Sequence, residues 1–258
     1  MITKLKEDPL LSILSKNMIY SILDQYKHLS SSKNGIPRGV GISAFLSEIY
    51  MKDIDARFKK TENIFFYARY VDDIIVVTDN EHASSIKTCI INELNEIKLK
   101  INEEKTKTIK FTKESQDSFD YLGYSFSKNT IGLSEKRINK YRSKIDLAFA
   151  DFEKKRKTKR RKAIQLLIKR IKYLTFNTKL KKSKSSILTG VYFNNLLLEN
   201  KQQLDDLDRY LIEKIDTIKS KLKSKLLKFS FSKGFSNKKF YNFSLEDLSE
   251  ITKIWKDI

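Results

Sequence analysis

The sequence predicts an α+β protein, in which an antiparallel sheet with helices on one face is followed by an all-helical, basic region. Three observations predict this class. Apolar residues recur at helical spacing through most of the chain, and two β-rich runs flank a short acidic turn. The net positive charge is concentrated in the second half of the chain. Residues 1–130 hold 19 Lys and Arg against 18 Asp and Glu, whereas residues 131–258 hold 33 against 14. We therefore expect two parts, residues 1–130 and residues 131–258.

The first part begins with a helix over residues 16–27, where apolar side chains follow the i, i+3, i+4, i+7 pattern. Residues 35–41 should be irregular because a proline and several glycines interrupt them. A second helix should start near Ser43, which is a plausible N-cap.

A tight hairpin should follow, because two β-rich runs, residues 65–70 and 74–77, leave almost no room between them. Asp79 or Asn80 then caps a helix whose apolar face is Ile86, Cys89, Ile90, Leu94 and Ile97. Short strands are expected at residues 106–111 and 119–126.

The turn of this hairpin holds Asp72 and Asp73. Two adjacent carboxylates repel each other and resist burial, and a divalent cation removes that cost. Mg²⁺ is usually held by one or two carboxylates together with substrate phosphates, and two such ions can clamp a phosphoryl transfer. The simpler alternative is an acidic turn without chemistry, since aspartate is common in turns.

The second part should be helical, with apolar faces over residues 138–152, 164–174 and 204–222. The first of these helices continues into a segment with eight basic residues in nine. They are Lys154, Lys155, Arg156, Lys157, Lys159, Arg160, Arg161 and Lys162. No structure is assigned to residues 223–240.

The length, composition and net charge of the chain restrict the class of protein. A chain of 258 residues with 40% hydrophobic residues can form a substantial core, and the single Cys89 excludes a disulfide framework and suits the cytoplasm. The apolar runs are too short for a membrane span. A net charge of +20 favours a polyanionic partner such as nucleic acid, although solubilising lysines in a Lys-rich proteome would give the same total.

Four motifs in order resemble the palm of a reverse transcriptase: GIPRGVGIS at residues 35–43, YVDD at 70–73, KLKINEEKTK at 98–107 and FDYLGYSF at 119–126. The resemblance implies that Asp72 and Asp73 are catalytic and bind Mg²⁺, with Mn²⁺ as a possible substitute. It also implies a nucleotide and template pocket and a primer grip. The pocket residues would be Gly35, Pro37, Arg38, Gly39, Ser43, Tyr70, Val71 and Lys105, and the grip residues Leu122, Gly123 and Tyr124.

By the same resemblance, residues 1–130 are a partial palm and residues 131–258 a thumb whose basic segment follows the nucleic-acid backbone. A basic amphipathic helix can instead lie on an anionic membrane, but we expect no membrane partner. The expected activity is RNA-directed DNA polymerisation on an RNA or DNA template-primer duplex with dNTPs. The family usually has glutamine at the position of Arg38. The GIPRG sequence found here is similar to that of bacterial defence-associated reverse transcriptases, which act in antiviral defence. Retron and group II intron reverse transcriptases are the alternative subgroups.

The family takes a third metal-binding aspartate from a strand upstream of the glycine-rich loop. Asp8 and Asp24 lack the strand context of that residue. We therefore expect the fingers and this strand to be missing, because the sequence is a fragment, a remnant, or one of two chains whose partner supplies them. Alone, the chain should not polymerise. A non-catalytic nucleic-acid-binding subunit of a defence complex is the alternative function.

Overall fold

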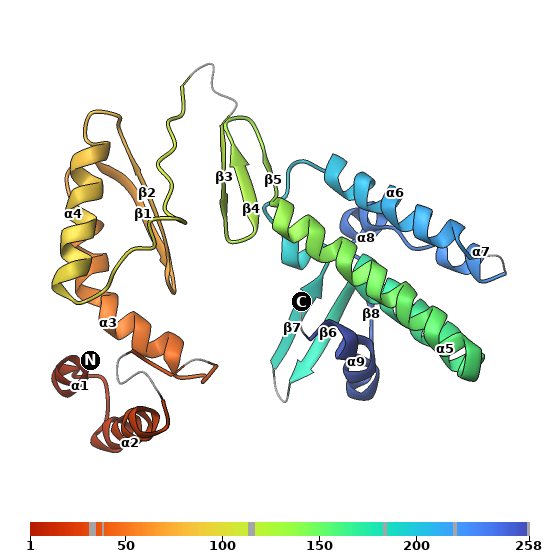
Figure 1. Cartoon of the computed structure of the whole chain (residues 1–258), viewed down its shortest axis with the longest axis horizontal. Helices are drawn as coiled ribbons and strands as arrows, with labels where there is room; N and C mark the ends of the chain where they lie inside the picture. The colour runs from red at the N-terminus through yellow and green to blue at the C-terminus, as the bar shows by residue number, and fades with distance from the viewer. Residues whose placement is uncertain (31–34, 38, 113–116, 183–184, 219–220, 257–258) are drawn as a thin grey trace. The chain divides into compact units, whose positions relative to one another are not determined.

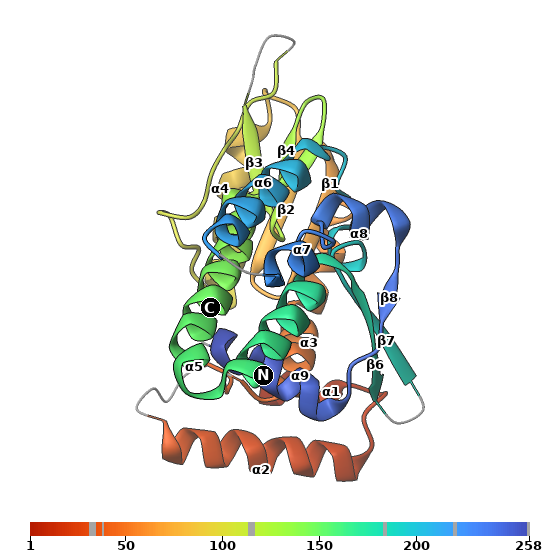
Figure 2. The same ribbon diagram turned by 90° about the vertical axis from the view of Figure 1, so that its right-hand side faces the viewer.

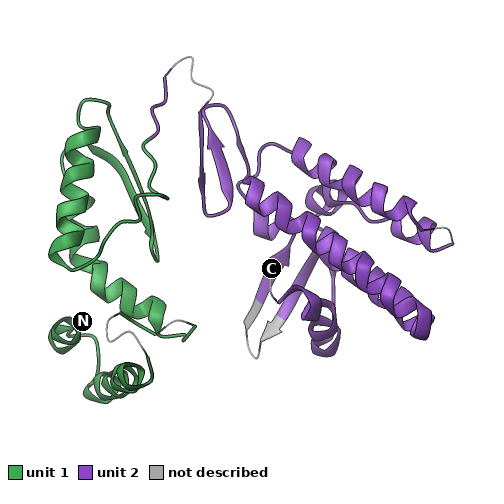
Figure 3. Ribbon diagram, viewed as in Figure 1, with its two compact units in different colours: residues 1–108 green, residues 109–258 purple. Residues whose placement is uncertain are grey.

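The computed structural model describes residues 1–258 apart from 31–34, 38, 113–116, 183–184, 219–220 and 257–258 (Figure 1). The chain divides into two compact units, residues 1–108 and residues 109–258 (Figure 3). Each unit has its own elements and its own buried clusters, and each is described by itself.

Unit 1 contains four helices and one hairpin among its described residues (Figure 1). In chain order they are α1 (Ile2–Glu7), α2 (Ile13–Leu29), α3 (Ser43–Phe58), β1 (Ile64–Tyr70), β2 (Asp73–Thr78) and α4 (Ala83–Glu96). The predicted first helix, the hairpin and the helix after it are confirmed. Strands β1 and β2 pair antiparallel, and in the described part of the unit they form a sheet of two strands.

Helix α3 is central to this unit because its buried face serves two clusters. Its first half packs Leu46 and Ile49 with residues of α1 and α2, and its second half packs Ile54 and Phe58 with Tyr67 of β1 and Leu94 of α4. A hairpin of two strands is marginal by itself. Its position therefore depends on α3 and α4. Apolar side chains stay exposed on the hairpin, namely Phe65, Phe66, Tyr70 and Val77.

Unit 2 begins with an antiparallel sheet of β3 (Ser118–Tyr121), β4 (Tyr124–Ser127) and β5 (Ile131–Leu133). The long segment α5 (Glu135–Thr175) and a second sheet follow. That sheet is formed by β6 (Asn177–Lys182), β7 (Ser185–Gly190) and β8 (Phe240–Tyr241). The remaining elements are η1 (Phe193–Asn195), α6 (Gln202–Asp216), α7 (Leu222–Leu226), α8 (Phe231–Asn237), α9 (Leu245–Thr252) and η2 (Lys253–Trp255).

The segment α5 is a helical hairpin rather than one rod. The backbone of Lys159 is non-helical, with φ −132° and ψ 56°. Arg170 reaches back to Asp151 with an Nη1–Oδ2 distance of 2.6 Å, although a continuous helix would separate these residues by about 28 Å. Figure 2 shows the two arms of α5 side by side. The arms bury Phe149 and Leu167 in the large core of unit 2.

Trp255 anchors the end of the chain in that core. Its side chain is buried, its Nε1 donates to the carbonyl oxygen of Lys144 at 3.1 Å, and its ring stacks on Tyr173 with centroids 6.1 Å apart. Trp255 is therefore a packing residue of unit 2.

Several sequence predictions need correction. Unit 2 is mainly helical, but it also contains the strands β6, β7 and β8, which were not predicted. Residues 106–111 are described and form no strand, and the predicted strand 119–126 is two strands, β3 and β4. Cys89 is exposed rather than part of the buried face of α4. In the described part of the chain no helix combines the length and the apolar character needed to cross a membrane.

Two predicted N-caps are also wrong. Ser43 is the first residue of α3, and its hydroxyl donates to the carbonyl oxygen of Pro37 instead of accepting from the helix. The residue before α4 is His82, whose backbone N–H donates to Oδ1 of Asp79 at 2.8 Å. Asp79 thus orders the chain three residues before the N-cap position of α4, whereas Ser43 lies inside α3, one residue after its N-cap position.

Candidate active site

Asp72 and Asp73 lie at the tip of the β1–β2 hairpin. Tyr70 pairs with Asp73, so Val71 and Asp72 are the two residues of the turn. Val71 has φ 58°, and a positive φ at the first turn position is typical of a type II′ turn. A β-branched residue is rare there, and such strain often accompanies function. Tyr70, Val71 and both aspartates are exposed. The turn thus presents two carboxylates to solvent on a defined backbone.

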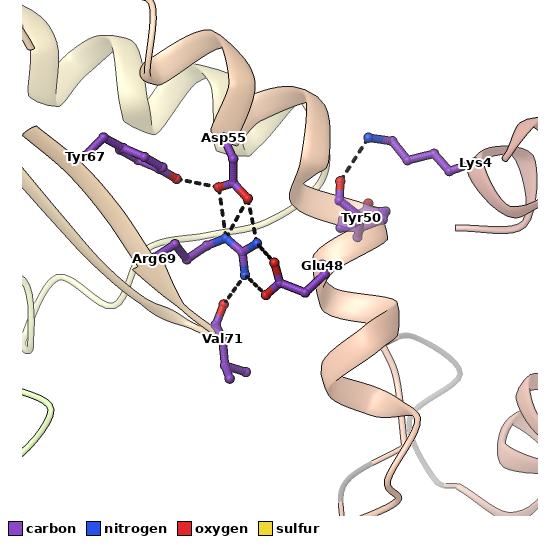
Figure 4. A network of polar contacts seen from close by, with 7 residues as sticks. All are labelled: Lys4, Glu48, Tyr50, Asp55, Tyr67, Arg69 and Val71. Atoms are coloured by element: carbon purple, nitrogen blue, oxygen red, sulfur yellow. Dashed lines mark hydrogen bonds and ion pairs between the residues drawn. The ribbon is translucent and has the colours of Figure 1, made fainter. Parts of the chain in front are cut away.

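Arg69 holds the backbone of this turn through its guanidinium group (Figure 4). Its side chain is only 3% exposed, and its Nη1 donates to the carbonyl oxygen of Val71 at 2.9 Å. The same guanidinium donates to both oxygens of Glu48 at 3.0 Å, and its Nη2 lies 2.6 Å from Oδ2 of Asp55. Glu48 and Asp55 both belong to α3. A single side chain therefore joins the aspartate turn to the helix that follows the glycine-rich loop. We call Arg69, Glu48 and Asp55 the arginine clamp.

The charges of the clamp are mutually stabilised. Burial raises the pKa of Asp55, but hydrogen bonds from Arg69 and Tyr67 outweigh burial and hold the pKa below its ordinary value. Tyr67 donates to Oδ1 of Asp55 at 2.7 Å, and burial together with this bond raises the pKa of the phenol. Asp55 is therefore ionised at neutral pH and Arg69 keeps its charge.

The glycine-rich loop leads directly into α3. Gly35 and Gly39 have positive φ values of 96° and 74°, and a Cβ at either position would meet no atom within 4 Å. Backbone conformation, rather than space, is therefore the reason for glycine at these positions. Pro37 is buried, and the Ser43 hydroxyl bonds to it. Arg38 lies outside the described residues.

No third acid joins the aspartate pair among the residues that the structure describes. That part of the chain contains no group of three or more His, Cys, Asp or Glu side chains able to hold a metal ion. Asp8 accepts from the backbone N–H of Leu10, and Asp24 lies 3.7 Å from His28 on α2. Two exposed oxygen donors fit a part of a magnesium site, not a complete protein cage.

Lys105 is not brought to the pair by any contact that the structure describes. It lies in a turn in which its backbone N–H and that of Thr106 both donate to the carbonyl oxygen of Asn102. Its side chain is exposed. Its role at a nucleotide stays a prediction.

The predicted grip residues lie in unit 2, at the β3–β4 turn. Leu122 and Gly123 both have positive φ, 51° and 81°, as in a type I′ hairpin. A Cβ on Gly123 would lie 2.8 Å from Nε of Arg137, whose guanidinium carbon lies 4.7 Å from the ring centre of Tyr124. Arg137 also donates to the carbonyl oxygen of Leu122 at 3.4 Å. Glycine is thus required both for the turn and for the approach of Arg137.

The basic segment is the tip of the α5 hairpin and not a continuous helix face. All eight of its basic residues are exposed. Lys155 pairs with Asp151 and Arg156 with Glu153, at 2.9 and 2.7 Å. The other six have no ion pair with a carboxylate in the described structure. The turn concentrates these charges at one end of the two arms.

Sequence reasoning missed the arginine clamp and Arg137. A signal for Arg69 existed, because it shares the period-two face of β1 with the buried Tyr67, where a charged residue requires a partner. The partners could not be identified without knowing that α3 lies across that face.

The aspartate turn and the arginine clamp lie in a segment of the chain that matches a known protein family. Residues 2–126, just under half of the chain, match the model of the reverse transcriptase (RNA-dependent DNA polymerase) family. Protein P of Heron hepatitis B virus is 28% identical over 110 residues, which are 42% of this chain and 13% of that protein. Protein P of Duck hepatitis B virus (isolate brown Shanghai duck S5) is 27% identical over the same length and shares. The chain thus spans about an eighth of the length of these curated relatives.

Proposed function

We propose that the chain is the palm and thumb portion of an RNA-directed DNA polymerase, with Asp72 and Asp73 as its catalytic, metal-binding pair. The observation that carries this proposal is the exposed aspartate turn held by the arginine clamp to the helix after the glycine-rich loop. This arrangement lies inside the segment that matches the reverse transcriptase model. A merely acidic turn needs neither a buried arginine nor a strained valine.

The proposed reaction is attack of a primer 3′-hydroxyl on the α-phosphate of a dNTP, with pyrophosphate leaving. Asp72 and Asp73 would hold Mg²⁺, or Mn²⁺ in its place, and the metal supplies positive charge that offsets the phosphates. Arg69 keeps the turn in one conformation. Gly35, Pro37, Arg38, Gly39, Ser43, Tyr70, Val71 and Lys105 would shape the nucleotide and template pocket.

Unit 2 would hold the nucleic acid. Leu122, Gly123 and Tyr124 are proposed to contact the primer, and the basic tip of α5 to follow phosphates of an RNA or DNA duplex. The tip suits phosphates because six of its cations have no carboxylate partner in the described structure. The proposed domains remain a palm over residues 1–130 and a thumb over residues 131–258.

A third carboxylate must join the pair for efficient two-metal chemistry. We propose that a fingers and strand segment outside the described residues, or a second chain, supplies it. The chain tested by itself should therefore show no primer extension with Mg²⁺, a primed RNA template and dNTPs. Processive extension by the isolated chain would contradict this part of the proposal.

The resemblance of GIPRG to defence-associated enzymes supports a role in antiviral defence in the bacterial cytoplasm. The alternative is a non-catalytic nucleic-acid-binding subunit. It is favoured by the basic second unit and by the lack of a third acid beside the pair among the described residues. The two differ in what the aspartates do. If the Asp72→Ala/Asp73→Ala variant still protects a host against phage, the binding role is correct and catalysis is irrelevant.

Metal binding tests the pair directly in the isolated chain. We expect loss of the free Mn²⁺ electron paramagnetic resonance signal on titration with the protein, and no such loss with Asp72→Asn/Asp73→Asn. The matched control is Asp205→Asn/Asp206→Asn, which neutralises another adjacent pair, on α6. Equal Mn²⁺ binding by both double variants would place the metal elsewhere and contradict the proposal.

A further inference from the structure

A hollow in unit 2 combines lysines with aromatic rings. It has a volume of about 420 Å³ and is lined by the last turn of α5, the α7–α8 connection, α8 and the segment around β8. Its lining residues are Lys172, Phe176, Lys228, Phe229, Lys233, Asn237, Lys239 and Tyr241. Four lysines and three aromatic rings face it, and no acidic residue lines it. We call it the lysine–aromatic pocket.

The lysines of this pocket have no counter-charge among the described residues. None of the four forms an ion pair with a carboxylate. The ammonium groups of Lys172 and Lys239 lie 4.0 and 5.5 Å from the centre of the same ring, that of Tyr241. Converging like charges repel, and an anion between them would relieve that repulsion.

Acids near α8 are already engaged. Asp208 accepts from the Ser230 hydroxyl and from the backbone N–H of Phe231, both at 2.6 Å, and Asp205 accepts from the Ser232 hydroxyl at 2.5 Å. These carboxylates cap the start of α8 and bond to none of the pocket lysines. The pocket therefore keeps its positive charge.

The aromatic rings form a fixed wall. Phe176 is buried and meets Tyr241 and Phe229 edge to face, with centroids 5.1 and 6.0 Å apart. Phe229 and Tyr241 are only half-buried, so parts of their surfaces remain open to the hollow. An ordinary phosphate site needs no such rings. Cations that bind phosphate beside rings that stack on a base are the combination used for unpaired nucleotides.

We propose that the lysine–aromatic pocket binds one unpaired nucleotide, with its phosphate among Lys172, Lys228, Lys233 and Lys239 and its base against Phe229 and Tyr241. The nucleotide is either free or part of a single strand. This site is formed by residues of unit 2 alone, and it requires neither Asp72 nor a metal. It would hold a nucleotide whether or not the chain polymerises.

The test is calorimetric titration of the full chain with a nucleoside monophosphate at low salt in the presence of EDTA, which removes metal from the aspartate pair. We expect saturable binding that is weakened at least tenfold in Lys228→Glu/Lys233→Glu. The matched control, Lys201→Glu/Lys253→Glu, makes the same charge change at two exposed lysines of unit 2 outside the pocket and should bind within twofold of the unchanged chain. Asp72→Asn/Asp73→Asn should also leave binding unchanged, which separates this proposal from the polymerase proposal.

Further titrations test whether the base contributes to binding. Inorganic phosphate should bind roughly 5- to 150-fold more weakly than the nucleotide, the range expected for one stacked base. Tyr241→Phe should retain binding and Tyr241→Leu should lose it, with Trp255 fluorescence used to verify that both variants are folded. Equal binding of phosphate and nucleotide, or equal binding by the two lysine double variants, would overturn the proposal.

Competition identifies the source of the nucleotide. A short oligonucleotide without terminal phosphates that displaces the monophosphate indicates a single strand as the ligand, whereas failure to compete indicates a free nucleotide. Tight binding of an acidic peptide in place of the nucleotide would overturn the assignment.

Discussion

At the scale of single residues, Arg69 is the side chain on which the geometry of the aspartate turn depends. It is 3% exposed, it donates to the turn itself, and both of its carboxylate partners lie on α3. Asp55 is 16% exposed and would be left without its cation if Arg69 were removed. The aspartate turn would then lose its connection to α3, and among the described contacts only the hydrogen bond from Tyr67 to Asp55 would still join the hairpin to that helix.

Replacing Arg69 by methionine should therefore destabilise unit 1 by about 3 kcal/mol, because a largely buried carboxylate loses its partner. The measurement is urea unfolding followed by circular dichroism. The matched control is Arg57→Met, which removes a half-exposed arginine from its pair with Glu93 and should cost less than about 1 kcal/mol. The double variant Arg69→Met/Asp55→Asn should recover part of the loss, and equal destabilisation by Arg69→Met and Arg57→Met would contradict the role of the clamp.

The clamp also predicts a dependence of stability on pH. The pKa of Asp55 is lower in the folded chain than in the unfolded chain, so its ionisation stabilises the fold above the unfolded value of about 3.9. That contribution is lost as the pH falls through the lower, folded value. We expect the unfolding free energy of the unchanged chain to fall more steeply below about pH 4 than that of Asp55→Asn.

The control for this measurement is Glu103→Gln, which removes one exposed carboxylate outside the clamp. Its acid profile should follow that of the unchanged chain. Parallel profiles for the unchanged chain and Asp55→Asn would show that the network does not stabilise the ionised form.

At the scale of elements, the α5 hairpin places its charges where a duplex can reach them. A basic helix face would spread eight cations along about 12 Å, whereas the turn at Lys159 collects them at one end. Lys157, Arg160 and Arg161 have no carboxylate partner in the described structure and are exposed. A phosphate group would therefore give these three cations the counter-charge that they lack in the described structure.

Replacing Lys157, Arg160 and Arg161 by glutamine should lower the slope of log K against log salt for duplex binding by about 2 to 3, close to one unit for each lost phosphate contact. Fluorescence anisotropy of a labelled duplex at several salt concentrations gives the slope. The control triple variant, Lys136→Gln/Lys201→Gln/Lys253→Gln, removes three exposed cations elsewhere in unit 2 and should change the slope by less than one. A larger change in the control would indicate a different nucleic-acid surface.

Elements with a strong local pattern could be predicted from the sequence. The β1–β2 hairpin has two β-rich runs and no room for a longer loop, and α2 has a clear apolar face. The break in α5 could not be predicted, because helical spacing continues on both sides of Lys159 and no glycine or proline marks it. The β6–β7 hairpin was missed because its strands are rich in lysine and serine, and its first residues, Asn177 and Thr178, are polar yet buried.

The candidate site was predictable to a similar extent. The position of Asp72 and Asp73 at a hairpin tip could be predicted from the β-rich runs on either side, whereas their catalytic role is predicted only by the resemblance of the four motifs to a reverse transcriptase. The partners of Arg69 and the approach of Arg137 to Gly123 depend on tertiary packing, which spacing along the chain does not encode. The strand predicted at residues 106–111 shows the opposite error, since β-branched residues alone do not supply a partner strand.

At the scale of the whole molecule, the two units differ in how they are stabilised. Unit 2 has one large cluster of buried residues, which includes Trp255, whereas the buried residues of unit 1 form two small clusters that share α3. Larger continuous apolar burial gives more stability. Trp255, the single tryptophan of the chain, reports only on unit 2.

We therefore expect two unfolding transitions in urea. Far-ultraviolet circular dichroism should begin to fall at lower urea than Trp255 fluorescence, because unit 1 unfolds first. Arg69→Met should shift only the first transition. A single transition that coincides for both probes would show that the two units unfold together.

The central claim is that Asp72 and Asp73 carry metal-dependent nucleotidyl transfer, and the most direct measurement uses the protein with whatever accompanies it in its host. A tagged chain is purified from cells that express it from its own locus, and primer extension with Mg²⁺ and dNTPs is measured. We predict extension that falls at least a hundredfold with Asp72→Asn/Asp73→Asn and persists with Asp205→Asn/Asp206→Asn. Extension that is undiminished in the Asp72→Asn/Asp73→Asn assembly would contradict the claim.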